Sequence, residues 1–128
     1  MRTKLILRFY FSVDKLEQSL NNIIMRKACT PSNASADYCS VQIIEIINDK
    51  VRLARLWDCL YSFLCKFSQK ELNALSLYAL MRNGVYQLPE KEYKEVNRLR
   101  AKFLRRAKSS VEKMKVELET LYKYSALL

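Results

Sequence analysis

Residues 67–72 read Phe-Ser-Gln-Lys-Glu-Leu, and this stretch marks where a new helix begins after the N-terminal half of the chain. The hydroxyl of Ser68 can accept a hydrogen bond from the amide of Glu71, whose carboxylate can reach back to the amide of Ser68. Phe67 and Leu72 can then pack across this capping box as a hydrophobic staple. The pattern predicts a helix that begins at Ser68 and stops at a left-handed turn at Asn83-Gly84. Its inward face is expected to carry Leu72, Leu75, Tyr78 and Ala79.

A long helix is predicted after this capped one. Pro89 suits a first helical turn, where its missing amide would be unpaired anyway, and Glu90 and Glu92 lie at the positive end of the helix dipole. No breaker follows before about Tyr124, so we expect one helix over residues 89–124. About nine turns is long for this chain, so its far end must pack on other helices or on a second copy. The predicted apolar stripe is Val96, Leu99, Phe103, Ala107, Val111, Met114, Leu118 and Leu121.

Two further helices are predicted before the capped one. Apolar residues at steps of three and four indicate a helix over residues 3–27, with a strand over residues 5–11 as the alternative. Its stripe is Ile6, Phe9, Val13, Leu16, Leu20 and Ile23.

Residues 28–40 are rich in turn formers and predict a loop. A well-buried helix is then expected over residues 40–66. Its face is Val41, Ile44, Ile47, Val51, Ala54, Trp57, Tyr61 and Leu64, widened by Ile43, Leu53, Leu56 and Leu60.

These segments predict an all-α fold in one domain over residues 1–128. Residues 3–66 should form a long antiparallel helical hairpin with its loop at residues 28–40, because two helices of matched length joined by one loop pack in this way. A short capped helix and a long basic C-terminal helix should follow. Half of the 128 residues are hydrophobic, which is enough for one core without disulfides or metals.

The composition disfavours an enzyme. The chain has no histidine, which removes the commonest general base and metal ligand. Gly84 is the one glycine, so no glycine-rich loop can cradle phosphates. The cysteines form no Cys-x-x-Cys pair, and we expect reduced thiols at Cys29, Cys39, Cys59 and Cys65. We therefore expect no catalytic residues, no cofactor and no metal.

The sequence also predicts a cytoplasmic protein. Residues 1–11 resemble the start of a signal peptide, but Arg8 interrupts the apolar run and no small-residue cleavage site follows. No window approaches the roughly 20 apolar residues that a membrane span requires.

The net charge of +10 is concentrated in one segment. Residues 98–115 hold eight lysines and arginines against the single acid Glu112. Arg100 falls within the apolar stripe, where its long stem is expected to serve a structural contact. Six of the other cations of this segment, together with Lys91 and Lys94 before it, fall opposite the stripe or on its flanks. We call this set the cationic ridge: Lys91, Lys94, Arg98, Lys102, Arg105 and Lys113, flanked by Arg106 and Lys108.

Several functions are compatible with such a ridge. A solvated face that maintains solubility is the simplest, and anionic membrane surfaces or an acidic protein are others. The excess of cations favours phosphate binding, with Lys94, Arg98, Lys102, Arg105, Arg106 and Lys108 as the nucleic-acid-binding residues. Trp57 and the tyrosines could stack on bases, but at helical spacing they are more often core.

Residues 67–115 resemble a known family. They read FSQKELNALSLYALMRNG (67–84) and NRLRAKFLRRAKSSVEKMK (97–115), and are similar to region 4 of sigma-70-type factors and to small phage ArpU-like regulators. The matching opening residues are Ser68, Glu71, Leu75, Leu77 and Tyr78, and the matching basic run is Arg98, Arg105, Arg106, Ala107 and Lys108. The layout of residues 5–65 also looks like the N-terminal hairpin of the phage proteins. Only residues 85–88 separate Gly84 from Pro89, so the helix-turn-helix around residues 83–95 is degenerate.

The resemblance implies a sigma-like, phage- or mobile-element-derived transcriptional regulator. Its partners would be DNA, contacted through phosphates, and RNA polymerase or another protein. The alternative is a non-catalytic helical interaction module, such as a homodimer, that uses the stripe of the last helix near Val111 and Met114.

Overall fold

The structure, a computed structural model, describes residues 3–29, 36–81 and 89–128. All regular secondary structure within these residues is helical, which confirms the predicted all-α class. The elements are α1 (Thr3–Phe11), α2 (Val13–Cys29), α3 (Ala36–Leu64), α4 (Gln69–Leu80), α5 (Glu90–Lys113), α6 (Lys115–Leu121) and the 3-10 helix η1 (Tyr122–Leu127).

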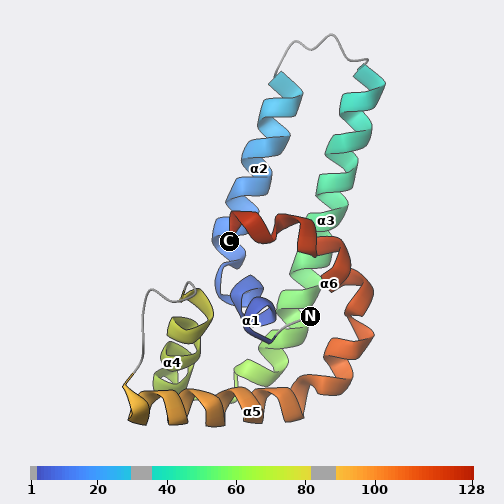
Figure 1. Cartoon of the computed structure of the whole chain (residues 1–128). Coiled ribbons are helices and arrows are strands. Elements are labelled where there is room, and N and C mark those ends of the chain that lie inside the picture. Colours follow the sequence, from blue (N-terminus) through green and yellow to red (C-terminus); the bar gives the residue numbers. More distant parts are fainter. Residues whose placement is uncertain (1–2, 30–35, 82–88) are drawn as a thin grey trace.

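Helices α2 and α3 lie side by side and run in opposite directions (Figure 1). Polar contacts join them along their length: Lys27 Nζ donates to Gln42 Oε1 at 2.7 Å, and Lys50 Nζ donates to Asn21 Oδ1 at 2.6 Å. Helix α3 begins at Ala36, four residues earlier than predicted. Of the predicted loop, residues 30–35 lie outside the described residues.

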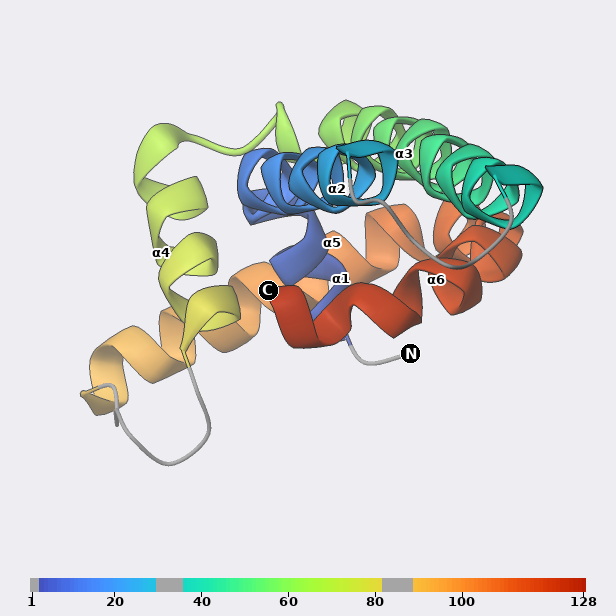
Figure 2. The same ribbon diagram turned by 90° about the horizontal axis from the view of Figure 1, so that it is seen from above.

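The single helix predicted over residues 3–27 is interrupted at Ser12, and residues 5–11 are helical rather than extended. Ser12 continues the hydrogen-bond ladder, since its amide donates to the Arg8 carbonyl and its carbonyl accepts from the Leu16 amide. Helix α1 nevertheless turns away from the axis of α2 (Figure 2). The predicted stripe remains continuous through the bend, with Ile6, Phe9, Leu16 and Leu20 buried.

The long helix predicted over residues 89–124 is also divided, and the break lies at Met114. The Met114 amide is shared between the carbonyls of Ser110 and Val111, both at 3.1 Å, which tightens the turn there. Helix α5 forms the base of the molecule, α6 turns back along α3, and η1 reaches across to α2 (Figure 1). The bend delivers Leu118, Leu121 and Tyr124 to the common core, so the far end packs on the protein's own helices.

The inward face of α3 differs from the prediction. Leu53, Leu56, Leu60 and Leu64 are buried as expected, together with Ile46 and Asp49. Most of the predicted main stripe instead points outward, because α2, α5 and α6 all pack on the other side of α3. The outward or half-exposed residues are Val41, Ile44, Ile47, Val51, Ala54, Trp57 and Tyr61.

Helix α4 begins as predicted. The Ser68 hydroxyl accepts from the Glu71 amide at 3.2 Å, and the Glu71 carboxylate accepts from the Ser68 amide at 3.0 Å. Leu75 and Ala79 are buried, whereas the helix ends at Leu80, before the predicted stop. The stop at Asn83-Gly84 lies outside the described residues.

A buried carboxylate fastens the C-terminal segment to α3. Asp49 is 1% exposed and accepts hydrogen bonds from Lys123 Nζ, Arg52 and the hydroxyl of Tyr124. Burial acts to raise the pKa of Asp49, but the hydrogen bonds from Lys123 and Tyr124 and the Lys123 charge outweigh it and lower that pKa. Burial and the bond to Asp49 raise the pKa of Tyr124. No apolar pattern could have revealed this contact.

Candidate nucleic-acid interface

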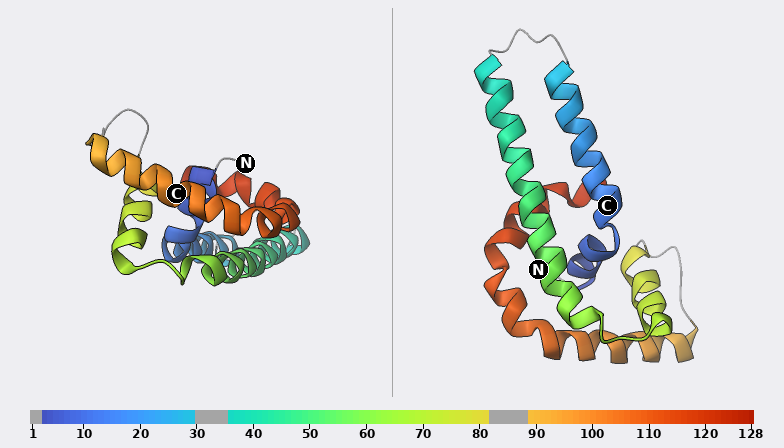
Figure 3. Two further views of the ribbon diagram at one scale, coloured as in Figure 1. Left: turned by 90° about the horizontal axis from the view of Figure 1, so that it is seen from below. Right: turned by 180° about the vertical axis from the view of Figure 1, so that it is seen from behind.

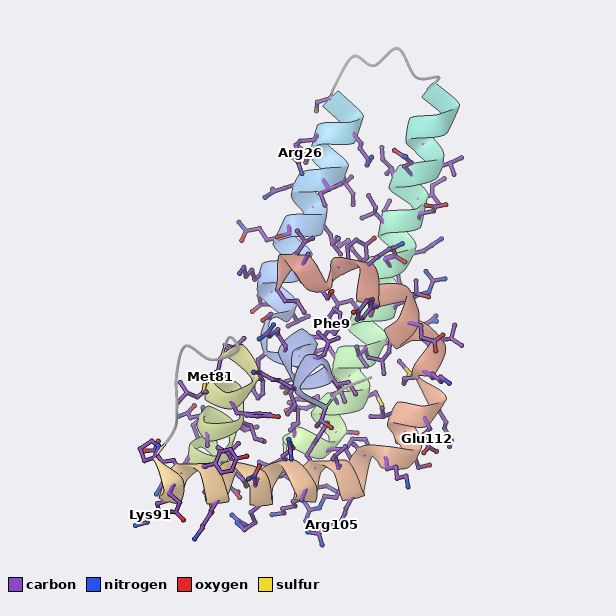
Figure 4. The ribbon with its side chains drawn as sticks, viewed as in Figure 1. Phe9, Arg26, Met81, Lys91, Arg105 and Glu112 are labelled. Atoms are coloured by element: carbon purple, nitrogen blue, oxygen red, sulfur yellow. The ribbon has the colours of Figure 1, made fainter. Side chains whose placement is uncertain are left out.

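Helix α5 turns its predicted apolar stripe inward and its cations outward. Val96, Leu99, Phe103 and Ala107 are buried, and Val111 and Met114 are packed against the same core. The opposite face therefore meets solvent, and Figure 4 shows Arg105 pointing away from the fold at the outer edge of α5. Of the six predicted binding residues, Lys102 is half-buried, and Lys94, Arg98, Arg105, Arg106 and Lys108 are exposed.

The centre of the ridge lies over the capped start of α4. Phe67 is 5% exposed, and the Nζ of Lys102 lies 5.1 Å from the centre of its ring. The guanidinium of Arg106 lies 6.0 Å from the same ring. The aromatic face attracts these cations and limits their motion. A shallow, open hollow in this region is lined by Arg98, Lys102, Arg105 and Arg106, so the structure brings four of the six predicted residues together.

Acids of the protein itself hold two of the predicted cations. Arg98 forms two hydrogen bonds to Glu95, at 2.6 and 3.1 Å, and lies 3.5 Å from Glu71. The hydrogen bond from Arg98 lowers the pKa of Glu95 and raises that of Arg98. Lys94 lies 3.4 Å from Glu90. These exposed pairs are weak, but each still reduces the charge available to an outside anion.

Arg105 and Lys108 are in a different position. Within the described parts of the chain, neither forms an ion pair or a hydrogen bond. Arg106 is exposed, and its guanidinium lies near the Phe67 ring rather than beside an acid of the described residues. The usable positive charge is therefore concentrated at Lys102, Arg105, Arg106 and Lys108, in the middle of α5.

Arg100 serves the fold, as its position in the stripe predicted. Its NH1 donates to the hydroxyl of Tyr78 at 3.1 Å, and its guanidinium lies 5.8 Å from that ring. Arg8 acts similarly on α4, donating to the carbonyls of Ala79 and Met81 at 2.9 and 3.0 Å. These two arginines fix α4 between α1 and α5.

The first turns of α5 are mixed in charge, because the exposed Glu90, Glu92 and Glu95 alternate with the exposed Lys91 and Lys94. Beside them, α4 and α5 border a groove with an apolar floor and a rim of mixed charge. A recognition helix usually places its N-terminal residues against base edges. At that end the acids and bases nearly balance, since Lys94 pairs with Glu90 and Arg98 pairs with Glu95, whereas residues 102–108 hold four cations and no acid.

The aromatic residues considered for base stacking are partly exposed. Trp57 stacks between Tyr10 and Tyr61, with ring centres 5.4 and 5.0 Å apart and planes nearly parallel. The predicted core role therefore holds only in part, because Tyr61 is 49% exposed. The sequence did not reveal this stack, since Tyr10 and Trp57 come from different helices.

The described residues hold no group of three or more acids or cysteines arranged to bind a metal. Cys29, Cys59 and Cys65 are free thiols, and burial raises the pKa of Cys59. Within the same described residues, no helix is both long enough and apolar enough to cross a membrane.

Comparison with known proteins gives no relative. No family model, no curated protein and no solved structure matches the chain.

Proposed function

We propose that the protein binds DNA through phosphates, using the middle of α5. The observation that supports this most directly is the set of cations on the outward side of α5, opposite its buried stripe: Lys102, Arg105 and Arg106 line one hollow with Arg98, and Lys108 is exposed further along the same helix. A helix that already has a complete apolar contact does not need these cations for folding. Their concentration exceeds what solubility requires.

A polymeric phosphate fits this arrangement better than a small anion. Residues 102–108 extend over about 9 Å of helix, whereas duplex DNA carries one charge per roughly 1.7 Å of its axis. Several phosphates can therefore meet the cluster at once. Binding would then depend little on base sequence, because phosphate contacts position a protein without reading bases.

A role in transcription is the more specific part of the proposal, and it rests on the resemblance to sigma region 4 and ArpU-like regulators. In that interpretation, α4 and α5 correspond to a degenerate helix-turn-helix whose connection, residues 82–88, lies outside the described residues. RNA polymerase would be the protein partner. The capped start of α4 and the basic run of α5 support this part.

The test is binding of the purified chain to short fluorescent duplexes of two unrelated sequences. We expect similar affinities for both, and a loss of about tenfold when Arg105→Gln and Arg106→Gln are combined. The matched control, Lys15→Gln with Arg55→Gln, removes the same charge from exposed sites on α2 and α3 and should bind as wild type. Equal losses in the two double variants would show that net charge, not the cluster, is responsible, and absent binding at low salt would end the proposal.

A further inference from the structure

A group of aromatic rings stays partly exposed where α1 meets α3. Trp57 stacks on both Tyr10 and Tyr61, and the Tyr10 ring meets the edge of the Phe11 ring with centres 5.1 Å apart. Tyr61 is 49% exposed, and the other three residues are half-buried. We call Tyr10, Phe11, Trp57 and Tyr61 the aromatic platform. It offers solvent a flat aromatic surface, and nucleobases stack on surfaces of this kind.

The aromatic platform reaches the turn between α3 and α4. Burial raises the pKa of Tyr10, and the neighbouring Tyr61 and Cys65 raise it further, so these three residues lie together. The chain stays coiled beyond them, since the Cys65 amide donates to the Tyr61 carbonyl and the Phe67 amide donates to the Leu64 carbonyl. Six residues at about 1.5 Å each place Phe67 roughly 9 Å from Tyr61 along this axis.

The same turn meets the cationic ridge. The Lys102 ammonium and the Arg106 guanidinium both lie against the ring of Phe67. Residues 59–70 add the exposed Lys66 and contain no acid. The rear view in Figure 3 shows the lower end of α3 and this turn in front, directly above α5. Exposed aromatic rings and unpaired positive charge are therefore neighbours on one side of the molecule.

We propose that the aromatic platform binds an unpaired base of a single-stranded DNA segment, stacked on Tyr61, while the phosphates of the same strand continue onto Lys66, Lys102 and Arg106. The inference rests on the phosphate binding proposed for α5 and adds a contact to a base. A strand with one phosphate per ~3.4 Å or more crosses the roughly 9 Å to Phe67 within three nucleotides. Asp58, the nearest preceding acid, comes almost one helical turn before Tyr61, on the side away from the turn.

Such a site distinguishes single strands from duplexes. Aromatic side chains next to cations bind single strands with little sequence preference, because every base has a face that can stack. The bases of a duplex already stack on one another and are not free to cover Tyr61. The aromatic platform should therefore strengthen binding of unpaired DNA and leave the affinity for blunt duplex unchanged.

The test compares a fluorescent oligothymidine with an abasic strand of the same length, which keeps the phosphates and lacks the bases. Wild type should bind oligothymidine about tenfold more tightly. Tyr61→Ala should abolish this preference and bind duplex as wild type does, whereas Tyr61→Phe should keep the preference because the ring remains. Tyr122→Ala is the matched control: Tyr122 is 58% exposed on η1, and its loss should change nothing.

The outcomes separate this inference from the proposed function. Equal wild-type affinities for the two strands, or a preference that survives Tyr61→Ala, would overturn the base contact while duplex binding through α5 stands. Absent binding to every strand and duplex at low salt would end both proposals. A clear preference for oligouridine over oligothymidine would overturn the assignment to DNA. The wild-type comparison needs no substitution, so it decides even if circular dichroism shows lower helicity for Tyr61→Ala.

Discussion

The two long helices, α3 and α5, use their surfaces in opposite ways. Helix α5 has one apolar stripe, which is buried, and a face of cations directed to solvent. Helix α3 has apolar residues around most of its circumference, and about half of them are left exposed. A narrow apolar stripe identifies the buried face of a helix, whereas a helix that is apolar around most of its circumference leaves its buried face ambiguous. We assign the exposed face of α5 to phosphate binding.

The largest expected effect tests which face of α3 is inward. Leu53→Ala should destabilise the fold by about 2–5 kcal/mol, because Leu53 is 2% exposed and its truncation leaves a cavity. Ile47→Ala, the matched control from the outward face, should cost less than about 1 kcal/mol in the monomer. Urea unfolding at low protein concentration measures both. Equal losses would contradict the outward position of Ile47, and a larger loss from Ile47→Ala would mean that the predicted main stripe faces the core.

The next effect concerns the link between α3 and the end of the chain. Asp49→Asn removes a buried negative charge that Lys123 and Arg52 face, and should cost about 2–3 kcal/mol at neutral pH. Asp58→Asn, an exposed acid on the same helix, is the control and should change stability by less than about 0.5 kcal/mol.

The pH dependence of stability gives this link a second readout. The pKa of Asp49 is lower in the folded chain than its usual value of 3.8. The contribution of Asp49 to the free energy of unfolding is therefore complete above pH 3.8. It is lost as the pH falls through the depressed folded pKa, when the carboxylate takes up a proton. Wild-type stability should therefore fall at acid pH more steeply than that of Asp49→Asn. Parallel pH profiles of unfolding free energy would contradict the role given to Asp49.

The smallest expected effect tests the capping box at the start of α4, which lies beneath the cationic ridge. Ser68→Ala removes the side-chain cap of α4 and should cost about 1 kcal/mol. Ser109→Ala, at an exposed position inside α5, should be neutral or slightly stabilising, because alanine is the better helix former. Thermal unfolding of the two variants measures the difference. A neutral Ser68→Ala would mean that the capping box does not fix Phe67 beneath Lys102.

Much of the fold follows from local sequence patterns. The α5 stripe from Val96 to Ala107 and the capping box at Ser68 were predicted from spacing alone. The bends at Ser12 and Met114 were not, because neither has a proline or glycine and each is stabilised by what packs beyond it. The buried Asp49 was also missed, since its partners Lys123 and Tyr124 are distant in sequence.

The candidate site was predictable in outline only. Angular spacing placed Lys102 and Arg105 opposite the apolar stripe of α5, with Arg106 and Lys108 on its two flanks. Spacing could not show that Glu95 and Glu71 would hold Arg98, because Glu71 reaches it from another helix. The inward face of α3 was ambiguous for a related reason: only the positions of α2, α5 and α6 decide which of its apolar sides is covered.

The central claim is that four cations in the middle of α5 contact DNA phosphates. The most direct measurement is the dependence of duplex affinity on salt for wild type and for Arg105→Gln combined with Arg106→Gln. Four contacts predict a log–log slope of about −3.6 for wild type and about −1.8 for the variant. A slope near zero, or one that the two substitutions leave unchanged, would contradict the account.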